Sequence, residues 1–458
     1  MTVQTQSRDK TRTFREMDKR YTWHPFTQMK EWAREDVVVI ERGEGVWLFD
    51  TDGKKYLDGV SSLWCNVHGH RVPEIDEAIN RQLGAVAHST FLGLSHRPAI
   101  ELSEKLAALA PGKLSRVFYS DSGSEGVEIA LKMAFQFWAQ SGRPEKNRFA
   151  RLKLAYHGDT VGAVSVGGIE LFHDIYKPLL FKTFEAPSPY VYRWPTSSDP
   201  QTVCAEAAGE IENIFRKHRG EIAAFIIEPL MQGAAGMIAH PRGFLKRAAE
   251  LTKQYGILLI CDEVATGFGR TGTMFACEQE EVNPDIMVLA KGLTGGYLPL
   301  AATLATEEIF RAFWADYSEC KTFFHGHTYT ANPLACSAAI ASLGLFEKNQ
   351  VLKNLRLKIE RLRRGLEKFY ELPIVGDVRQ AGTMVGIELV KDRGHKTPFA
   401  WEEKIGVRVI ERARKKGAIL RPLGPVIVLM PPLVMENTEL DDLLSITYDS
   451  IRETGAGH

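Results

Sequence analysis

The chain has 458 residues, of which 44% are hydrophobic and 25% charged, and these proportions are ordinary for a globular protein of two or three domains. Its 57 basic and 57 acidic residues give a formal net charge of zero, which argues against a nucleic-acid partner and against a charged tail. The first 20 residues lack the apolar core of a secretory signal, and no apolar run is long enough to cross a bilayer, so we expect a cytoplasmic protein without a membrane partner.

The N-terminal segment, residues 1–75, is expected to join a smaller C-terminal domain. Residues 1 to about 20 are polar and predict a frayed or weakly helical start. Residues 21–29 carry three aromatic side chains around Pro25, a composition that disfavours a regular helix. Residues 37–49 and 55–57 predict the two strands of a hairpin around Asp52-Gly53, and a glycine-rich loop with Trp64 follows.

The central part of the chain alternates between short apolar strands and helices. Residues 72–110 predict helices with a break near 89–95, and residues 176–200, with five prolines, predict a long irregular loop. The expected strands are 117–120, 149–155, 222–227, 257–261, 287–290 and 300–305, and the expected helices include 201–218 and 242–255. This alternation is typical of an α/β domain with a mostly parallel sheet and helices on both faces, which we place at residues 76–334.

Two buried strands of the expected sheet end in residues whose chemistry suits one cofactor. Asp262 follows the strand 257–261, and Lys291 follows the strand 287–290. Ligands of such sheets gather at the carboxyl ends of the strands, so we expect both side chains to face one crevice. Pyridoxal phosphate needs a lysine for a Schiff base and a carboxylate beside its ring nitrogen. Either residue alone would be an ordinary loop residue, but together with the motifs below the pair indicates this cofactor.

Further polar residues follow other strands of the same sheet. In the sequence Asp-Ser-Gly-Ser-Glu at 121–125, the backbone N–H groups of Gly123 and Ser124 are placed to bind a phosphate, although a plain helix N-cap explains the same residues. Tyr156 follows the strand 149–155 and is placed to stack on a planar ring, whereas we interpret His157 as a structural histidine. Glu228 ends the strand 222–227 at the same expected rim.

The C-terminal part predicts a separate α+β domain over residues 335–458. It is preceded by a polar loop at 325–333, in which the Thr328 hydroxyl could bind a phosphate. We expect a long helix to about residue 370, a helix at 402–416 and strands at 384–389, 419–421 and 426–430. The six cysteines show no CxxC pair or regular spacing, which predicts reduced thiols and no metal site.

The motifs SDSGSE, YHGD, EP, DEVATGFGR, AKG and HGHTYTANP together resemble the class III aminotransferases, over essentially the whole chain. The resemblance implies the pyridoxal-phosphate fold type I, transaminase activity, and a homodimer whose active site lies at the subunit interface. Within the class, WHPFTQM, YHGDTVGAVSV and the RPLG and MPP motifs resemble the branch that converts 8-amino-7-oxononanoate to 7,8-diaminononanoate in biotin biosynthesis. The alternative is an ω-amino acid or amine:pyruvate transaminase of the same class.

The resemblance also implies roles for individual residues. Lys291 corresponds to the Schiff-base lysine, which also acts as general base and then acid, and Asp262 to the partner of the pyridine nitrogen. Arg421 corresponds to the arginine that binds the substrate carboxylate. The implied cofactor ligands are Gly123, Ser124, Tyr156, Glu228, Asp262, Lys291 and, from the neighbouring subunit, Thr328. The implied substrate contacts are Trp64, Phe26, Tyr156, Gly326, Arg421 and Arg270, and for Arg270 hydrogen bonds that hold its own loop are an equal explanation.

The amino donor stays open at this point. The branch that uses S-adenosylmethionine usually has tyrosine at the position of Phe26, while a lysine-using branch resembles this chain at HPFTQM and GGIELFHDIY. Two other classes of protein fit poorly. A cofactor-binding gene regulator would need a DNA-binding domain, for which 20 N-terminal residues are too few, and GFGRTG lacks the GxGxxG spacing of a nicotinamide dehydrogenase.

Overall fold

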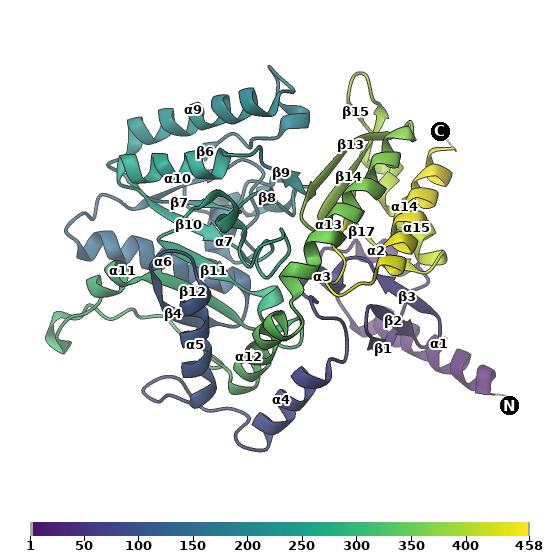
Figure 1. The fold of residues 1–458 in the computed structure, drawn as a ribbon, viewed down its shortest axis with the longest axis horizontal. Helices are drawn as coiled ribbons and strands as arrows, with labels where there is room; N and C mark the ends of the chain where they lie inside the picture. Colours follow the sequence, from purple (N-terminus) through teal and green to yellow (C-terminus); the bar gives the residue numbers. More distant parts are fainter. Residues whose placement is uncertain (1–2, 457–458) are drawn as a thin grey trace.

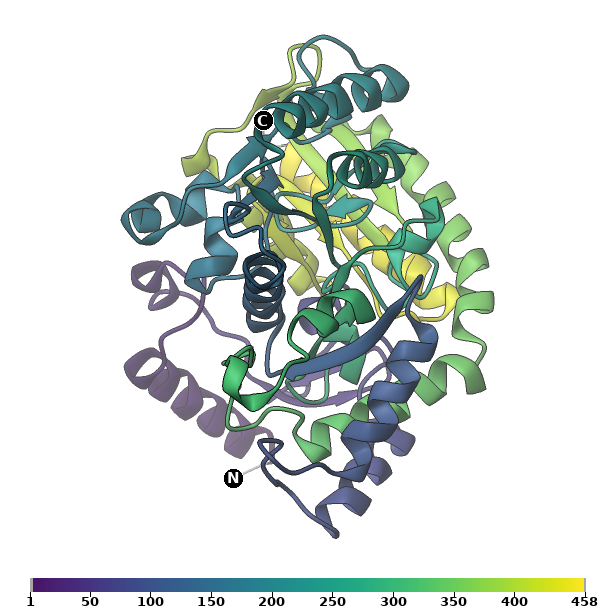
Figure 2. The same ribbon diagram turned by 90° about the vertical axis from the view of Figure 1, so that its left-hand side faces the viewer.

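The computed structural model describes residues 3–456 and has two lobes that lie side by side (Figure 1). The large lobe is built on a seven-stranded sheet, and the small lobe contains both ends of the chain. In Figure 2 the large lobe faces the viewer, and the yellow C-terminal elements of the small lobe lie behind it. Among the described helices, none has the length and apolar character of a membrane span.

The sheet of the large lobe has the order β4-β12-β11-β10-β7-β5-β6. β10 is parallel to β7 and β11, and β5 is parallel to β7 and β6, while β12 alone is antiparallel to both of its neighbours. This confirms the predicted α/β class with a mostly parallel sheet. The strands are β4 (Leu114–Ser120), β12 (Ala301–Thr306), β11 (Ile286–Leu289), β10 (Leu258–Asp262), β7 (Ile222–Ile227), β5 (Arg148–Leu152) and β6 (Phe184–Ala186).

Helices bury both faces of this sheet, as its uninterrupted apolar strands require. Phe225 and Ile227 of β7 share one core with α5 (Arg97–Leu109), α9 (Pro200–His218), α10 (Phe244–Tyr255) and α12 (Pro333–Lys348). Ala224 and Ile226, which alternate with them, share a second core with α6 (Gly123–Gln140). The start of α9 shows why these helices form where they do, because Pro200 opens the helix and the Asp199 carboxylate accepts a hydrogen bond from the Thr202 N–H at 2.8 Å.

The small lobe combines the two ends of the chain. Its main sheet has the order β13-β14-β18-β17, and a second sheet has the order β1-β2-β3-β16, in which C-terminal β16 runs parallel to N-terminal β3. The strands are β1 (Ile40–Glu44), β2 (Trp47–Asp50), β3 (Lys55–Asp58), β13 (Val375–Ala381), β14 (Met384–Asp392), β16 (Ala418–Ile419), β17 (Arg421–Leu423) and β18 (Val426–Leu429). The helices are α1 (Val3–Tyr21), α13 (Val351–Glu367), α14 (Ile405–Lys415) and α15 (Asn437–Gly455).

Several local expectations were wrong. Residues 37–49 do not form one strand, because Gly45 adopts a left-handed backbone (φ 56°) and separates β1 from β2. The expected long helix to residue 370 is divided into α12 and α13 at Gln350, which is also left-handed (φ 47°). The proline-rich loop contains β6, and β13 and α15 were not predicted. The domain boundaries at residues 75 and 334 stay predictions.

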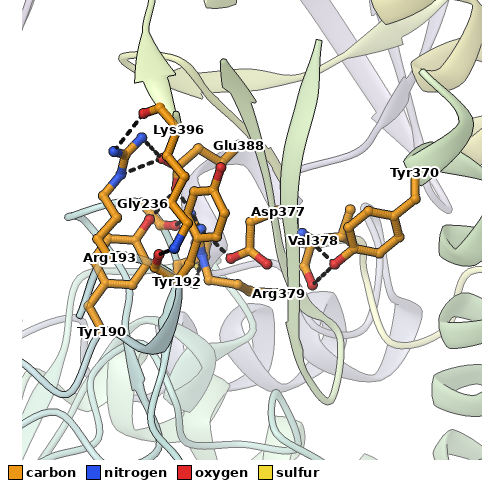
Figure 3. A network of polar contacts seen from close by, with 11 residues as sticks. Tyr190, Tyr192, Arg193, Gly236, Tyr370, Asp377, Val378, Arg379, Glu388 and Lys396 are labelled. Atoms are coloured by element: carbon orange, nitrogen blue, oxygen red, sulfur yellow. Dashed lines mark hydrogen bonds and ion pairs between the residues drawn. The ribbon is translucent and has the colours of Figure 1, made fainter. Parts of the chain in front are cut away.

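A buried polar network joins the two lobes (Figure 3). Arg379 on β13 donates to the Glu388 carboxylate on β14 at 2.6 Å and to the backbone carbonyls of Gly236 and Met237 at 2.6 and 2.9 Å. Glu388 also accepts hydrogen bonds from Arg193 and Tyr190 of the large lobe. The network therefore ties the small-lobe sheet to the loop at 190–193 and to the hairpin of β8 (Met231–Gln232) and β9 (Ile238–Ala239).

Candidate active site

A cavity of about 640 Å³ lies at the carboxyl ends of the central strands. Its walls come from the segments that follow β4, β5, β7, β10 and β11, together with Trp64 and residues near 294–300. The arrangement places side chains from five strands around one space, as expected for the carboxyl edge of a parallel sheet. The predicted site residues that line it are Trp64, Gly123, Ser124, Tyr156, Glu228, Asp262 and Lys291.

Lys291 lies just beyond β11 in a left-handed backbone conformation (φ 45°) and is half-buried. Its Nζ lies 5.3 Å from the centre of the Trp64 ring. Burial lowers the pKa of Lys291, while the nearby Asp262 and Glu228 carboxylates oppose this effect. A lowered pKa increases the fraction of neutral amine at physiological pH, and only the neutral amine can attack a carbonyl carbon or accept a proton.

Asp262 ends β10 and is fixed by hydrogen bonds on both of its oxygens. Oδ2 lies 2.7 Å from Nδ1 of His157, and Oδ1 accepts the Val264 N–H at 3.0 Å. An ionised carboxylate only accepts hydrogen bonds, so the His157 proton belongs on Nδ1. His157, interpreted from the sequence as a structural histidine, is buried, lines the cavity and orients Asp262. The sequence analysis did not foresee its contact with Asp262.

Glu228 is buried and holds two loops of the cavity. Its Oε1 accepts the Gly233 N–H at 2.9 Å, and its Oε2 accepts the Tyr156 N–H at 3.1 Å. Burial raises the pKa of Glu228 to about 7, with Asp262 adding to the rise and His157 opposing it. The position of the Tyr156 backbone therefore depends on a carboxyl group that titrates near neutral pH.

The start of α6 forms an anion cradle at one end of the cavity. The Glu125 carboxylate accepts the Ser122 N–H at 2.9 Å, so the capping arrangement considered for this sequence is present. It leaves the Gly123 and Ser124 N–H groups at the first helical positions, which have no acceptor within a helix. A side chain at residue 123 would lie 2.7 Å from Cγ1 of Val264, so the backbone can approach this wall only as glycine.

Arg270 lies outside the cavity lining and is fully buried. Nη1 donates to the Pro431 carbonyl at 2.7 Å, and Nη2 donates to the Asn66 carbonyl at 3.1 Å. Burial lowers the pKa of Arg270 to about 10. Its side chain thus joins the DEVATGFGR loop to the Trp64 loop and to the small lobe, which matches the loop-holding explanation considered from the sequence.

The remaining predicted residues also lie outside the lining. Arg421 on β17 is half-buried and close enough to Tyr156 to interact with it electrostatically, and it has no carboxylate partner among residues 11–456. Phe26 is exposed and packs on Phe172 at 5.4 Å between ring centres. Gly326 and Thr328 are exposed on the loop before α12.

One group of side chains has spacing compatible with a metal ion. Ligand atoms of Asp121, Glu125 and His327 lie within 4.8 Å of one another at the start of α6. Glu125 is already engaged in capping the helix through the N–H groups of Asp121 and Ser122. The group therefore has a structural explanation, and we assign no metal to it.

Fold and cavity together define an α/β enzyme with a lysine and a carboxylate facing one ligand site. Residues 29–451 match the family model of the class III aminotransferases, and the chain belongs to this family. The resemblance seen in the sequence is thereby confirmed, and the protein is an aminotransferase of a pyridoxal-phosphate-dependent class.

Individual relatives are similar over nearly their whole length. The chain is 54% identical to the adenosylmethionine-8-amino-7-oxononanoate aminotransferase of Geobacter sulfurreducens, over 98% of this chain and 99% of that protein. The crystal structure of the aminotransferase of the same name from Methanocaldococcus jannaschii has a TM-score of 0.92 and 48% identity, covering 96% and 99% of the two chains. The omega transaminase of Pseudomonas jessenii in complex with PMP has a TM-score of 0.92 and 32% identity, covering 96% and 98%.

Proposed function

We propose that this protein is the transaminase that converts 8-amino-7-oxononanoate to 7,8-diaminononanoate in biotin biosynthesis. The observation that carries the proposal is the Lys291 amine facing the same cavity as Asp262, in a chain whose relatives at 47% to 55% identity are named for that substrate. The six cysteines have no disulfide partners, which agrees with the predicted cytoplasmic location, and that location stays a prediction.

The cavity residues fit pyridoxal phosphate as the cofactor. Lys291 offers the amine, Asp262 the anion for a ring nitrogen, Tyr156 an aromatic ring, and Gly123 and Ser124 backbone donors for a phosphate. Glycine at 123 lets the start of α6 pack closely against Val264, which keeps these donors at the cavity wall. When bound, this cofactor supplies an aldehyde and a protonated ring that withdraws electrons from the carbon losing its proton.

The chain's own residues then position and move protons. Lys291 Nζ would take the proton from the amine-bearing carbon of the donor as a base and then, as an acid, give it to the cofactor carbon on the other side of the amine nitrogen. Asp262, held in place by His157 and the Val264 N–H, would stabilise the positive charge of the ring nitrogen. We assign the substrate carboxylate to Arg421, because its guanidinium is half-buried and has no carboxylate partner in the described chain. Phe26 and Gly326 stay predicted substrate contacts.

We further propose a homodimer in which Thr328 serves the phosphate site of the partner copy. Thr328 is exposed and outside its own cavity, and large apolar side chains on the same loop are exposed, with Phe324 at 77% and Tyr329 at 56%. Apolar area of this kind typically marks a protein interface. Sedimentation of the purified protein should give twice the chain mass of 51.3 kDa, and a monomer at micromolar concentration would contradict the dimer.

There is a second candidate for the amino donor and a second candidate for the reaction as a whole. The relatives are named for adenosylmethionine, which favours that donor, while Phe26 within HPFTQM keeps lysine as the other donor. The ω-amino acid or amine:pyruvate reaction is the second candidate function, since omega transaminases share the fold with TM-scores of 0.92 to 0.93 at 31% to 36% identity.

A substrate screen on the purified protein with pyridoxal phosphate separates these reactions. One arm supplies 8-amino-7-oxononanoate with S-adenosylmethionine or with lysine and measures 7,8-diaminononanoate. The other supplies an aryl amine with pyruvate and measures alanine. The proposal predicts fast turnover in the first arm with one of the two donors. Turnover confined to the second arm would replace it with the amine:pyruvate function.

A further inference from the structure

The segment that carries Trp64 into the cavity has an unusual backbone. Ser61, Ser62 and Trp64 have positive φ angles of 49°, 61° and 68°, although none of them is glycine. At Ser62 the ψ angle is −41°, which lies outside the left-handed helical region and near the strained geometry of a γ-turn. Residues in such conformations persist only where the surrounding structure holds them.

A buried carboxylate holds this bend. Asp58 is 0% exposed, its Oδ1 accepts the Ser62 N–H at 2.8 Å, and its Oδ2 accepts the Ser62 hydroxyl at 2.8 Å. Oδ2 also lies 3.0 Å from Nε2 of His70, whose Nδ1 lies 3.0 Å from Nδ2 of Asn66. The Asn66 side-chain oxygen accepts the Gly69 N–H at 2.7 Å. Both carboxylate oxygens of Asp58 are therefore committed to the loop, and none of these bonds faces the cavity.

The bend fixes the Trp64 indole between two parts of the site. Trp64 is 6% exposed, and Lys291 Nζ lies 5.3 Å from its ring centre. The ring also meets Gly233, where a Cβ atom would lie only 3.3 Å from Cζ3 of Trp64. The indole thus forms a wall beside the reactive amine, and its Nε1–H has no hydrogen-bond partner in the part of the chain that is described. Relaxation of Ser62 would rotate this wall.

We propose that Asp58 is a positioning residue that sets substrate selectivity by holding the strained bend at Ser62 and, through it, the Trp64 wall beside Lys291. Asp58 touches neither substrate nor cofactor in this assignment. A rigid indole restricts the width of the cavity next to the amine, so the wild-type protein favours a substrate with a slender chain at that point over a bulky aryl amine. The choice of the slender substrate rests on the proposed function, while the mechanical role of Asp58 does not.

The test compares Asp58→Asn, Ser62→Ala and Ser62→Gly with wild type, all loaded with pyridoxal phosphate. Asp58→Asn keeps the size of the side chain but cannot accept all three hydrogen bonds. We expect the KM for 8-amino-7-oxononanoate to rise about tenfold while kcat changes less than about threefold, and the relative rate with a bulky aryl amine to increase. Asp392→Asn is the matched control, because Asp392 is an exposed carboxylate that also bonds a histidine, His395.

Two further readouts separate positioning from a loss of folding. Hydrogen exchange of the loaded protein should accelerate at residues 60–66 in Asp58→Asn and stay unchanged in the peptides that contain Glu228 and Asp262. The double variant Asp58→Asn/Ser62→Gly should recover at least half of the lost selectivity, since glycine adopts positive φ without the clamp. In a Trp64→Phe background, Asp58→Asn should have little additional effect on KM.

The inference is overturned if folded Asp58→Asn keeps the wild-type KM and substrate ratio, or if its defect is the same with and without glycine at residue 62. Should Asp58→Asn fail to fold, Ser62→Ala against Ser62→Gly makes the same comparison, because both lose the hydroxyl and only the first keeps the strain. Absence of 8-amino-7-oxononanoate turnover in wild type would reject the proposed function alone, and the selectivity comparison would then use slender against bulky amines with pyruvate.

Discussion

Among single residues, Glu228 shows most clearly how burial changes chemistry in the cavity. Burial raises its pKa from 4.5 to about 7. Between these pH values the folded protein keeps a proton that the unfolded chain has lost, so the contribution of Glu228 lowers the free energy of unfolding as pH rises through this window and is constant above it. Glu228→Gln should remove that slope.

Urea unfolding of cofactor-free wild type and Glu228→Gln from about pH 5 to pH 8 measures the effect. The difference in unfolding free energy between the two proteins isolates Glu228 from all other titrating groups. Wild type should lose stability relative to the variant as pH rises towards 7. A difference that is independent of pH would mean that Glu228 is ionised throughout, with its carboxylate stabilised by the Gly233 and Tyr156 N–H groups.

A second prediction for a single residue concerns Arg421. If its guanidinium binds the substrate carboxylate, Arg421→Gln removes a charge-assisted, two-pronged hydrogen bond, which typically contributes about 1.5–3 kcal/mol. The KM for 8-amino-7-oxononanoate should therefore rise about 10- to 100-fold, while turnover of an amine donor without a carboxylate changes little. Steady-state kinetics of wild type and Arg421→Gln with both substrates measures this effect. An unchanged KM would show that Arg421 does not bind the substrate carboxylate.

The residues that the sequence could predict are those tied to strand ends. Lys291, Asp262, Tyr156 and Glu228 each follow an apolar strand, and a parallel sheet brings such positions together whatever the loops do. The contact between His157 and Asp262 could not be predicted, because the two residues lie 105 positions apart and no local pattern links them.

Two glycines within helices test whether close packing or helix propensity determines the effect of an alanine substitution on stability. Gly126 lies where α6 contacts the sheet, and a Cβ there would lie 2.7 Å from Cγ1 of Val288. Gly209 in α9 has open space around it. Alanine is favoured over glycine in a helix by about 1 kcal/mol, whereas overpacking a core costs about 1–3 kcal/mol. Gly209→Ala should therefore stabilise the protein, and Gly126→Ala should destabilise it.

Thermal unfolding of the two alanine variants beside wild type checks this pair. The melting temperature should move in opposite directions. Equal stabilisation by both substitutions would show that α6 can shift away from β11, and that the close approach of the helix to the sheet is not enforced by packing.

Element types were more predictable than element ends. The alternating strands and helices of residues 117–305 follow from apolar runs and their turns, and they are confirmed. The breaks at Gly45 and Gln350 depend on single left-handed residues, and a glutamine gives no sequence signal for that conformation. β6 has three residues at the sheet edge, too few for any periodicity to show.

For the whole molecule, the network around Arg379 and Glu388 is expected to hold the lobes together. Arg379 is 7% exposed, so Glu388→Ala would leave its charge buried and short of a partner, a defect that typically costs about 3–5 kcal/mol. Glu367→Ala, which removes an exposed partner of Arg363, is the control and should leave unfolding nearly unchanged. Chemical denaturation of the three proteins measures both effects, and similar stabilities would show that the lobes need no ionic contact.

The same network predicts sensitivity to acid. Burial alone would raise the pKa of Glu388, but Arg379, Tyr190 and Arg193 outweigh it and hold the pKa below its ordinary value. A carboxylate with a depressed pKa stabilises the folded protein above its unfolded pKa of about 4.3, and this stability disappears as pH falls through the folded value. The contacts of this network join residues near 190, 236 and 388, and no sequence pattern links positions so far apart. The division into two lobes, in contrast, follows from the change in strand and helix pattern after residue 334.

Lys291 is the amine through which this cavity is proposed to transfer an amino group. The most direct measurement is the rate of 7,8-diaminononanoate formation from 8-amino-7-oxononanoate by wild type and by Lys291→Ala, with pyridoxal phosphate and either donor supplied. We predict product with wild type and a rate lower by about a thousandfold or more with the variant. The variant lacks the Lys291 amine, which serves both the nucleophilic attack on the cofactor aldehyde and the proton transfer. A variant that keeps a rate within about tenfold of wild type would show that Lys291 does not carry the reaction.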